Sequence, residues 1–240
     1  MARTLFVSDL HLAEDRPATT ARFARFLEDV VPGADALYVL GDLFEYWAGD
    51  DGLALDFPAH VAALLRPAAQ AVPAFFMHGN RDFMIASRFC AETGLGLIPD
   101  PTTIELYGER TLLMHGDTLC TGDRAYLAFR AQVRDPAWQA AALARPLEER
   151  IAIARGMRTE SEGAKGGKGE AIMDVAPDAV EQAFVSSGCR VLIHGHTHRP
   201  ARHEHAAGGR TCVRWVLPDW YGAGGYLVAT ASGIEARTLD

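Results

Sequence analysis

Short apolar runs alternate along this chain with longer segments in which apolar residues recur three or four positions apart. A short apolar run between polar residues predicts a buried strand, and the wider spacing predicts an amphipathic helix. Their alternation predicts an α/β fold built in layers. The expected strands are 3–8, 36–40, 74–77, 102–106, 110–114, 190–193, 211–217 and 225–231, and the expected helices are 19–31, 57–71 and 85–93.

Residues 123–170 depart from this alternation because they contain no strand candidate. Their apolar residues predict short amphipathic helices that are interrupted at Pro136 and Pro146. We therefore expect a helical cap at 123–170, inserted into a core formed by 1–122 and 171–240. The cap carries nine Lys and Arg against seven Asp and Glu, within a chain of net charge −8. This positive charge favours an anionic ligand.

The composition narrows the class of protein. The chain has 240 residues and 49% hydrophobic content, which is enough to build one large core. Its apolar stretches fall short of the roughly 18 to 20 residues of a membrane-spanning helix, and its start lacks a secretion signal, so we expect a cytoplasmic protein. The four cysteines form no C-x-x-C pair and are expected to be reduced thiols in or near the core. A net charge of −8 disfavours nucleic acid as a partner.

Five short polar segments each follow an expected strand, at residues 9–11, 41–42, 79–82, 115–117 and 195–198. In α/β folds, ligand sites gather at the carboxyl ends of the strands. We therefore expect the polar side chains of these segments to converge. They offer seven candidate metal ligands, which are Asp9, His11, Asp42, Asn80, His115, His196 and His198.

The ligand types and their spacing predict a site for two metal ions. Carboxylate, amide and imidazole groups without thiolate suit Mn²⁺ better than a structural zinc ion. Asp9 and His11 are two positions apart, as are His196 and His198, and in a strand this spacing directs both side chains to one face. Each pair is therefore expected to bind one cation, with Asp42 bridging the two. Cations about 3.5 to 4 Å apart activate a shared water and clamp phosphoryl oxygens, which predicts hydrolysis of a phosphate ester or anhydride.

Two acidic residues of these segments, Asp82 and Asp117, are expected to orient the ligands rather than to bind metal. Taken singly, a histidine at a strand end is more often a hydrogen-bonded structural residue than a ligand. The metal site is favoured by the joint pattern. The histidines outside it are expected to be structural or solvated, namely His78, His194, His203 and His205.

Taken together, the segments resemble the calcineurin-like metallophosphoesterases, whose pattern is D-x-H, G-D, G-N, H-G and G-H-x-H. Within that superfamily the chain is similar to the UDP-2,3-diacylglucosamine hydrolases (pyrophosphatases) of the lipid A pathway over nearly its whole length. The similarity is carried by residues 8–12, 40–45, 78–83, 114–120, 171–175 and 194–200. It implies a layered β-sandwich flanked by helices, with two Mn²⁺ ions per chain.

The resemblance also implies a role for each candidate residue. The first Mn²⁺ would be held by Asp9, His11, Asp42 and His198, and the second by Asp42, Asn80, His115 and His196. The residues implied in catalysis are Asn80, Arg81, His115 and His196. The residues implied in substrate binding are Asn80, Arg81, Asp123, Ser161, Lys165, Lys168 and His196.

The implied reaction is attack of water at the α-phosphorus of UDP-2,3-diacylglucosamine, which gives UMP and 2,3-diacylglucosamine 1-phosphate (lipid X). Arg81 favours anhydride cleavage independently of the resemblance. Protein phosphatases of the superfamily usually have a histidine there that helps protonate the leaving group, whereas arginine cannot give up a proton near neutral pH. Arginine stabilises charge on phosphoryl oxygens, which suffices for a phosphate leaving group. The alternatives are another nucleotide anhydride hydrolase, a phosphomonoesterase and a non-catalytic binding module.

The cap is expected to help enclose the two acyl chains of such a substrate, and its short helices to make peripheral contact with the cytoplasmic face of the inner membrane. The glycine-rich segment 161–169 is expected to be a loop that either closes on substrate phosphate or serves as a flexible linker. No protein partner is inferred. Apolar candidates for the acyl chamber, for which ordinary packing between cap and core is the alternative, are Trp47, Phe83, Phe129, Trp138, Leu143, Ile151 and Ile153.

Overall fold

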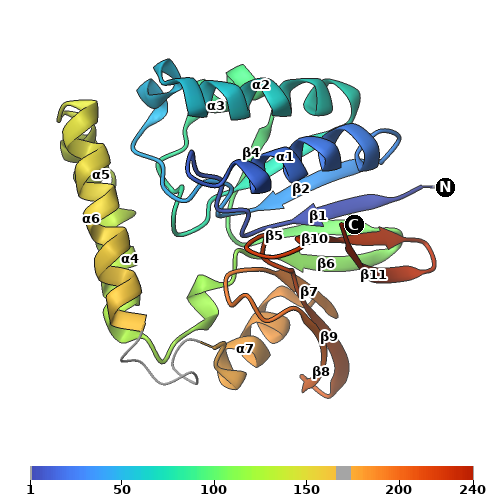
Figure 1. Cartoon of the computed structure of the whole chain (residues 1–240). Helices are drawn as coiled ribbons and strands as arrows, with labels where there is room; N and C mark the ends of the chain where they lie inside the picture. Colours follow the sequence, from blue (N-terminus) through green and yellow to red (C-terminus); the bar gives the residue numbers. More distant parts are fainter. Residues whose placement is uncertain (1, 166–173, 240) are drawn as a thin grey trace.

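The computed structural model describes residues 2–165 and 174–239, with only the backbone for 160–162, 164 and 165. Two β-sheets pack face to face, with helices on their outer sides (Figure 1). The first sheet has the strand order β11-β10-β1-β2-β3-β4, with bounds Gly233–Thr238, Gly225–Thr230, Thr4–Val7, Ala36–Leu40, Ala74–Met77 and Gly96–Ile98. The second has the order β5-β6-β7-β9-β8, with bounds Thr102–Leu106, Glu109–Leu113, Val191–His194, Arg210–Val216 and Ala201–Ala207. The predicted layered β-sandwich is confirmed.

The strands that precede the polar segments run parallel within each sheet. In the first sheet, β1 pairs in parallel with β2, and β2 with β3. In the second sheet, β6 pairs in parallel with β7. Parallel strands end at the same edge, so the loops after β1, β2 and β3 emerge together, as do those after β6 and β7.

Alternation along the strands builds three apolar layers. Leu5 and Val7 of β1 belong to the cluster under the helices of the first sheet, whereas Phe6 between them belongs to the cluster between the sheets. This follows from the two-residue period of a strand. The outer face of the first sheet is covered by α1 (Pro17–Arg25), η1 (Phe26–Val30), η2 (Asp50–Ala54), α2 (Asp56–Ala71) and α3 (Ser87–Thr93), and that of the second by α7 (Pro177–Ser187).

Helices α4 (Arg124–Val133), α5 (Pro136–Leu143) and α6 (Leu147–Lys165) stand together beside the sandwich, at the left of Figure 1. Asp123 caps α4 by accepting a hydrogen bond from the Tyr126 backbone N–H, and Asp135 caps α5 in the same way. Pro136 is the first residue of α5, where its missing N–H costs nothing. The interruption expected at Pro136 is therefore the start of α5, and Pro146 directly precedes α6.

The sequence pattern missed several elements. β8 and β11 are edge strands with mostly polar exposed residues, so they give no apolar alternation, and β4 and α7 were also not expected. The expectation of a loop from residue 161 was wrong for its first part, because α6 continues to Lys165. A single glycine within a helix costs only about 1 kcal/mol, so Gly163 does not end α6. Lys168 lies outside the described residues.

The cysteines are free thiols, and Cys120, Cys189 and Cys212 are buried while Cys90 is half-buried. Reduced thiols in or near the core were predicted, and this placement agrees with that prediction. Within residues 2–165 and 174–239, no helix combines the length and the apolar character needed to cross a membrane.

Candidate metal centre

All seven candidate ligands lie in loops that follow five strands. Asp9 and His11 come after β1, Asp42 after β2 and Asn80 after β3. In the second sheet, the loop after β6 provides one ligand and the loop after β7 provides two, which are His115, His196 and His198. The predicted convergence of these segments is present in the structure.

The backbone path of these loops differs from the one expected. Five of the seven have positive φ, with values of 54° for Asp9, 47° for His11, 53° for Asp42, 68° for His196 and 54° for His198. Asp9 and His11 therefore do not share a face through strand alternation, because β1 has already ended at Val7. Left-handed conformations are uncommon in non-glycine residues and cluster at functional sites. Of the other described non-glycine residues, Tyr107 alone has positive φ.

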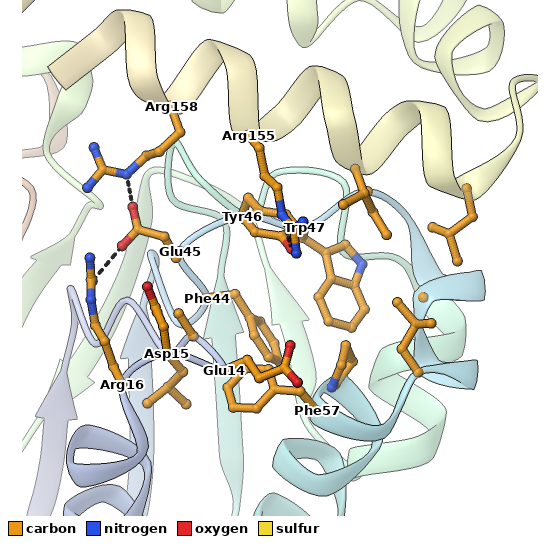
Figure 2. A pocket seen from close by; sticks show the side chains of 18 of the residues that line it. Glu14, Asp15, Arg16, Phe44, Glu45, Tyr46, Trp47, Phe57, Arg155 and Arg158 are labelled. Carbon is orange, nitrogen blue, oxygen red and sulfur yellow. Dashed lines mark hydrogen bonds and ion pairs between the residues drawn. The ribbon is translucent and has the colours of Figure 1, made fainter. Parts of the chain in front are cut away.

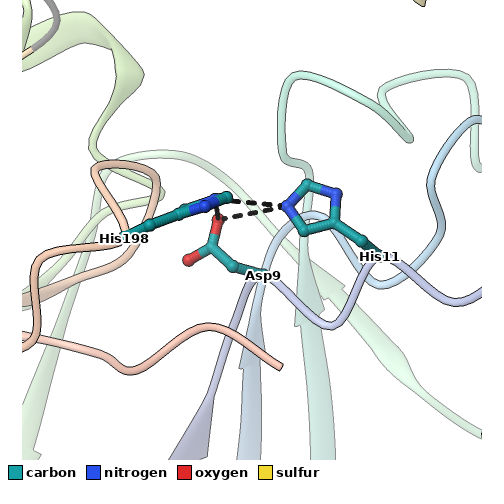
Figure 3. A group of neighbouring side chains, drawn as sticks. All are labelled: Asp9, His11 and His198. Carbon is teal, nitrogen blue, oxygen red and sulfur yellow. Dashed lines mark hydrogen bonds and ion pairs between the residues drawn. The ribbon is translucent and has the colours of Figure 1, made fainter. Parts of the chain in front are cut away.

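The first group of ligands is formed by Asp9, His11 and His198 (Figure 3). His198 Nε2 lies 3.2 Å from His11 Nε2 and 3.4 Å from Asp9 Oδ1. His11 Nε2 lies 4.0 Å from Asp9 Oδ1 and 3.8 Å from Asp42 Oδ2. One ligand atom from each of the three residues of the group falls within 4.8 Å of the others, so one cation can contact all three.

The second group surrounds Asn80. Its side-chain amide lies 3.0 Å from His115 Nε2 and 2.9 Å from His196 Nδ1. His115 Nδ1 donates to the Leu40 carbonyl at 2.9 Å, which leaves the lone pair of Nε2 directed into the centre. Asp42 Oδ1 lies 3.8 Å from His115 Nε2. Because its other oxygen faces His11, Asp42 stands between the two groups, as a bridging ligand must.

The candidate ligands are suited to divalent cations because four of them are buried. Asp9 and His115 are 0% exposed, Asp42 is 1% exposed and His11 is 2% exposed. Asp9 Oδ1 is buried and has no hydrogen-bond partner among the described atoms. Buried carboxylates are costly unless they are paired or bind metal. Two carboxylates, an amide and four imidazoles without thiolate are a donor set for hard or borderline cations such as Mn²⁺.

The surroundings also set the protonation of the histidines. Burial lowers the pKa of His11 well below its ordinary value and that of His196 to about 3. Both imidazoles are therefore neutral at neutral pH, the form that offers a lone pair to a metal. Burial also disfavours the charged form of His115, but Asp42, Asp117 and Asp9 outweigh it and raise its pKa to about 9. A proton and a cation therefore compete for His115 Nε2.

Asp82 and Asp117 stabilise the centre, but the groups that they bond differ from those expected. Asp82 accepts hydrogen bonds from the backbone N–H groups of Leu43 at 2.7 Å and Gly79 at 2.8 Å, so it fixes the turn that carries Asp42. Asp117 accepts from Arg130 Nε at 2.6 Å and from the Tyr126 hydroxyl, both on α4. Neither carboxylate bonds a ligand imidazole. His194 is structural as predicted, since it donates to the Gly195 carbonyl and accepts from Arg214.

The sequence profile of the calcineurin-like phosphoesterase family matches residues 2–200.

The chain belongs to the calcineurin-like phosphoesterase family.

Curated relatives of this phosphoesterase are similar to it from end to end. It is 51% identical to a UDP-2,3-diacylglucosamine hydrolase of Xanthomonas campestris pv. campestris (strain 8004), over 98% of each chain. It is 49% identical to a UDP-2,3-diacylglucosamine hydrolase of Stenotrophomonas maltophilia (strain K279a), also over 98% of each chain. The predicted resemblance to the UDP-2,3-diacylglucosamine hydrolases is thereby confirmed.

Solved structures share the fold at low sequence identity. An archaeal phosphodiesterase matches with a TM-score of 0.50 and 12% identity, over 99% of each chain. A hypothetical protein from Pyrococcus horikoshii OT3 matches with a TM-score of 0.51 and 10% identity, over 100% of this chain and 88% of its own. These matches support the fold alone.

A cavity of about 950 Å³ extends in this phosphoesterase from the candidate metal ligands to α4, α5 and α6. Four of the expected substrate-binding residues line it, namely Asn80, Arg81, Asp123 and His196. The side chains of Ser161 and Lys165 are not described, and Lys168 lies outside the described residues. The apolar part of the wall includes five of the candidates for an acyl chamber, which are Trp47, Phe83, Phe129, Trp138 and Ile153.

Two of the apolar candidates are placed elsewhere. Leu143 lines neither cavity and is 47% exposed. Ile151 lines a second cavity of about 770 Å³ between α6 and the start of α2 (Figure 2). Both cavities are lined by residues 45–48 and Arg158, which therefore form the wall between them. Helical spacing alone could not show which face of α6 meets which cavity.

Several residues near the site were not predicted. Tyr221 stacks on His11 with ring centroids 5.0 Å apart, and Tyr126 stacks on His196 at 6.0 Å. Arg134 donates to the Gly79 carbonyl at 2.8 Å. Glu45 has its Oε2 3.6 Å from His11 Nδ1. Glu45 lies inside a segment that carries the family resemblance, but nothing in the local pattern around Tyr221 marks it.

Proposed function

We propose that this protein hydrolyses the diphosphate of UDP-2,3-diacylglucosamine by attack of water at the α-phosphorus, giving UMP and 2,3-diacylglucosamine 1-phosphate. The observation that carries this proposal is a buried cluster of metal-type ligands at one end of a cavity whose far wall is apolar. A diphosphate that joins a nucleoside to a diacylated sugar has this distribution of charge and apolar surface. The names of the full-length relatives support the same substrate.

Two divalent cations, which we propose are Mn²⁺, would be held by the seven ligands. The first would be bound by Asp9, His11, Asp42 and His198, and the second by Asp42, Asn80, His115 and His196. When bound, such a pair lowers the pKa of water and stabilises charge on the phosphoryl oxygens. The left-handed loops and Asp82 hold the ligands in place beforehand, so little reorganisation is needed on binding.

Arg81 is proposed to stabilise the phosphate groups. It lines the cavity next to Asn80, and its backbone N–H donates to Asp42 Oδ1 at 2.8 Å. A guanidinium offers several donors to phosphate oxygens and does not act as a proton donor near neutral pH. This suits a leaving group that departs as a phosphate anion. It does not suit the alkoxide released from a simple phosphomonoester, which needs a proton.

The remaining walls are proposed to bind the lipid part of the substrate. We propose that residues 123–170 form a cap over the core of 1–122 and 171–240, and that the acyl chains lie between Trp47, Phe83, Phe129, Trp138 and Ile153. Polar contacts to the sugar and its phosphate are proposed for Asp123, Ser161, Lys165 and Lys168. Since the substrate is a lipid, we also propose cytoplasmic placement with peripheral contact to the inner membrane. An apolar wall argues against a soluble nucleotide anhydride, such as a dinucleoside polyphosphate, as the substrate.

The test incubates the purified protein and Mn²⁺ with UDP-2,3-diacylglucosamine in ¹⁸O-labelled water and analyses both products by mass spectrometry. Attack at the α-phosphorus places the label in UMP. Label in 2,3-diacylglucosamine 1-phosphate would contradict the proposed site of attack. No turnover would contradict the proposed substrate.

A further inference from the structure

Glu45 joins three segments that are distant in sequence. It lies beyond the Gly41–Asp42 turn, and its side chain is 9% exposed. Its carboxylate accepts a hydrogen bond at 2.7 Å from Nη1 of Arg16, which lies just before α1, and another from Arg158 Nε on α6 (Figure 2). Its Oε2 also lies 3.6 Å from Nδ1 of His11. The buried carboxylate of Glu45 thus contacts a candidate metal ligand, an arginine of the core and an arginine of α6.

The position of Glu45 beside His11 suits a carboxylate that supports a metal-binding histidine. His11 Nε2 faces Asp9, Asp42 and His198, so Nδ1 is the nitrogen that points away from the metal position. Nδ1 is buried and has no hydrogen-bond partner among the described atoms. Histidines that bind metals almost always donate their other N–H to a carboxylate, a carbonyl or water, which fixes the ring and its tautomer. Glu45 Oε2 is the carboxylate oxygen on that side of the ring.

Arg16 and Arg158 hold the Glu45 carboxylate close to Nδ1 of His11. Hydrogen bonds between guanidinium and carboxylate are among the stronger ones in proteins. Arg16 is itself held over the ring of Tyr221 at 4.9 Å, and that ring stacks on His11. Arg158 comes from α6, so the Glu45 carboxylate contacts both α6 and His11.

We propose that Glu45 is a positioning residue, which orients His11 for cation binding and fixes α6 over the cavity. The proposal rests on the cation site proposed above. It predicts that a change at Glu45 alters metal affinity and the mobility of α6 together, although Glu45 is not a metal ligand in the assignment above. A side chain that only joined α6 to the core would alter mobility alone.

The experiment compares E45Q with the control E149Q. Glu149 makes the same kind of ion pair, with Arg145, but at the exposed surface of α6. Mn²⁺ affinity is measured for the metal-free proteins from the electron paramagnetic resonance signal of the free ion, and hydrogen exchange is followed in residues 147–159. We expect E45Q to lose roughly tenfold in Mn²⁺ affinity and to exchange faster in α6, with wild-type behaviour in E149Q.

Wild-type Mn²⁺ affinity in a folded E45Q would overturn the proposal, even if α6 exchanged faster. If E45Q does not fold, R16M tests the proposal instead. This substitution removes the hydrogen bond from Arg16 to Glu45 and keeps the one from Arg158 on α6. Reduced Mn²⁺ affinity in R16M supports the proposal, and wild-type affinity overturns it. Failure of the proposed function is a separate result, since it would appear as a wild type that binds Mn²⁺ but does not hydrolyse UDP-2,3-diacylglucosamine.

Discussion

Individual residues of the centre adopt conformations that an isolated peptide would avoid. A left-handed backbone at a non-glycine residue costs of the order of 1 kcal/mol or more, and five candidate ligands adopt it. The surroundings compensate through contacts such as the four backbone N–H groups that reach Asp82. At Gly79, the absence of a side chain lets the backbone pack closely against Asp42, which also holds Asp42 in its conformation. We therefore expect the candidate ligands to be sensitive to small changes in the packing around them.

Gly79 provides a direct test of this tightness. A Cβ at Gly79 would lie 2.1 Å from Asp42 Oδ1 and 2.3 Å from the Asp42 backbone N, so G79A must displace the bridging carboxylate. We expect G79A to lose at least about tenfold in Mn²⁺ affinity, measured by titration of the metal-free protein. Gly156 is the control, because a Cβ there meets nothing within 4 Å. G156A should bind Mn²⁺ normally and raise the free energy of unfolding by up to about 1 kcal/mol. Normal Mn²⁺ binding by G79A would refute this reasoning.

Arg81 is the residue whose role is easiest to separate from metal binding. We expect R81Q to lower kcat on UDP-2,3-diacylglucosamine by about 100- to 1000-fold, because a donor to the transition-state charge is lost. Its Mn²⁺ affinity should stay at the wild-type level, since the backbone N–H that reaches Asp42 is retained. R66Q, at an exposed arginine of α2, should leave both unchanged. An R81Q enzyme with wild-type kcat would rule out this role.

At the scale of elements, α6 docks on one loop through three arginines. Arg150 donates to Asp51 and to the Ala48 carbonyl, Arg155 to the Tyr46 hydroxyl and Arg158 to Glu45. Arg130 of α4 likewise contacts Asp117, and Arg134, directly after α4, contacts the Gly79 carbonyl. Much of the positive charge expected to favour an anionic ligand therefore serves to dock these helices on the acidic core.

The pair of Asp51 and Arg150 gives this docking a pH dependence. The hydrogen bond from Arg150 lowers the pKa of Asp51 below its ordinary value of 3.8. A carboxylate with a lowered folded pKa adds stability above its unfolded pKa and loses it as the pH falls towards the folded one. Because Asp51 is 52% exposed, solvent screens the pair, and D51N should lower the free energy of unfolding by less than about 1 kcal/mol near pH 7.

Urea denaturation of wild type and D51N from about pH 7 to about pH 3 measures this effect. The difference between the two proteins should shrink as the pH falls below 3.8. E149Q, which removes an exposed pair, should show a smaller difference throughout. A difference that grows towards low pH would contradict the assignment.

At the scale of the whole molecule, the helices α4 to α6 stand beside the sandwich (Figure 1). They expose several apolar side chains. Leu143 is 47% exposed, Phe129 37% and Ile153 36%. Single exposed apolar residues are normal, but these three belong to the one group of helices that also lines the cavity. This placement suits a protein that takes its substrate from a bilayer surface.

Flotation with vesicles that contain anionic phospholipid tests the contact with membranes. We expect the wild type to float with the vesicles and L143S to bind more than about tenfold more weakly, because a leucine side chain contributes about 2 kcal/mol when buried. V185S is the matched control, since Val185 is 48% exposed on α7, away from α4 to α6 in Figure 1. Failure of the wild type to float, or an equal effect of V185S, would count against the proposed contact.

The amino-acid sequence by itself determined most strands of the core, the helical nature of 123–160 and the set of seven candidate ligands. Apolar runs report burial, and polar residues at strand ends report a site, because both signals are local. The sequence could not give the left-handed turns at Asp9 and His11, the edge strands β8 and β11, or the junction at Glu45. The edge strands pair with their neighbours in the chain, but they carry no apolar alternation that would mark them. The junction at Glu45 depends on a contact with Arg158, more than a hundred residues away, which only the folded chain brings together.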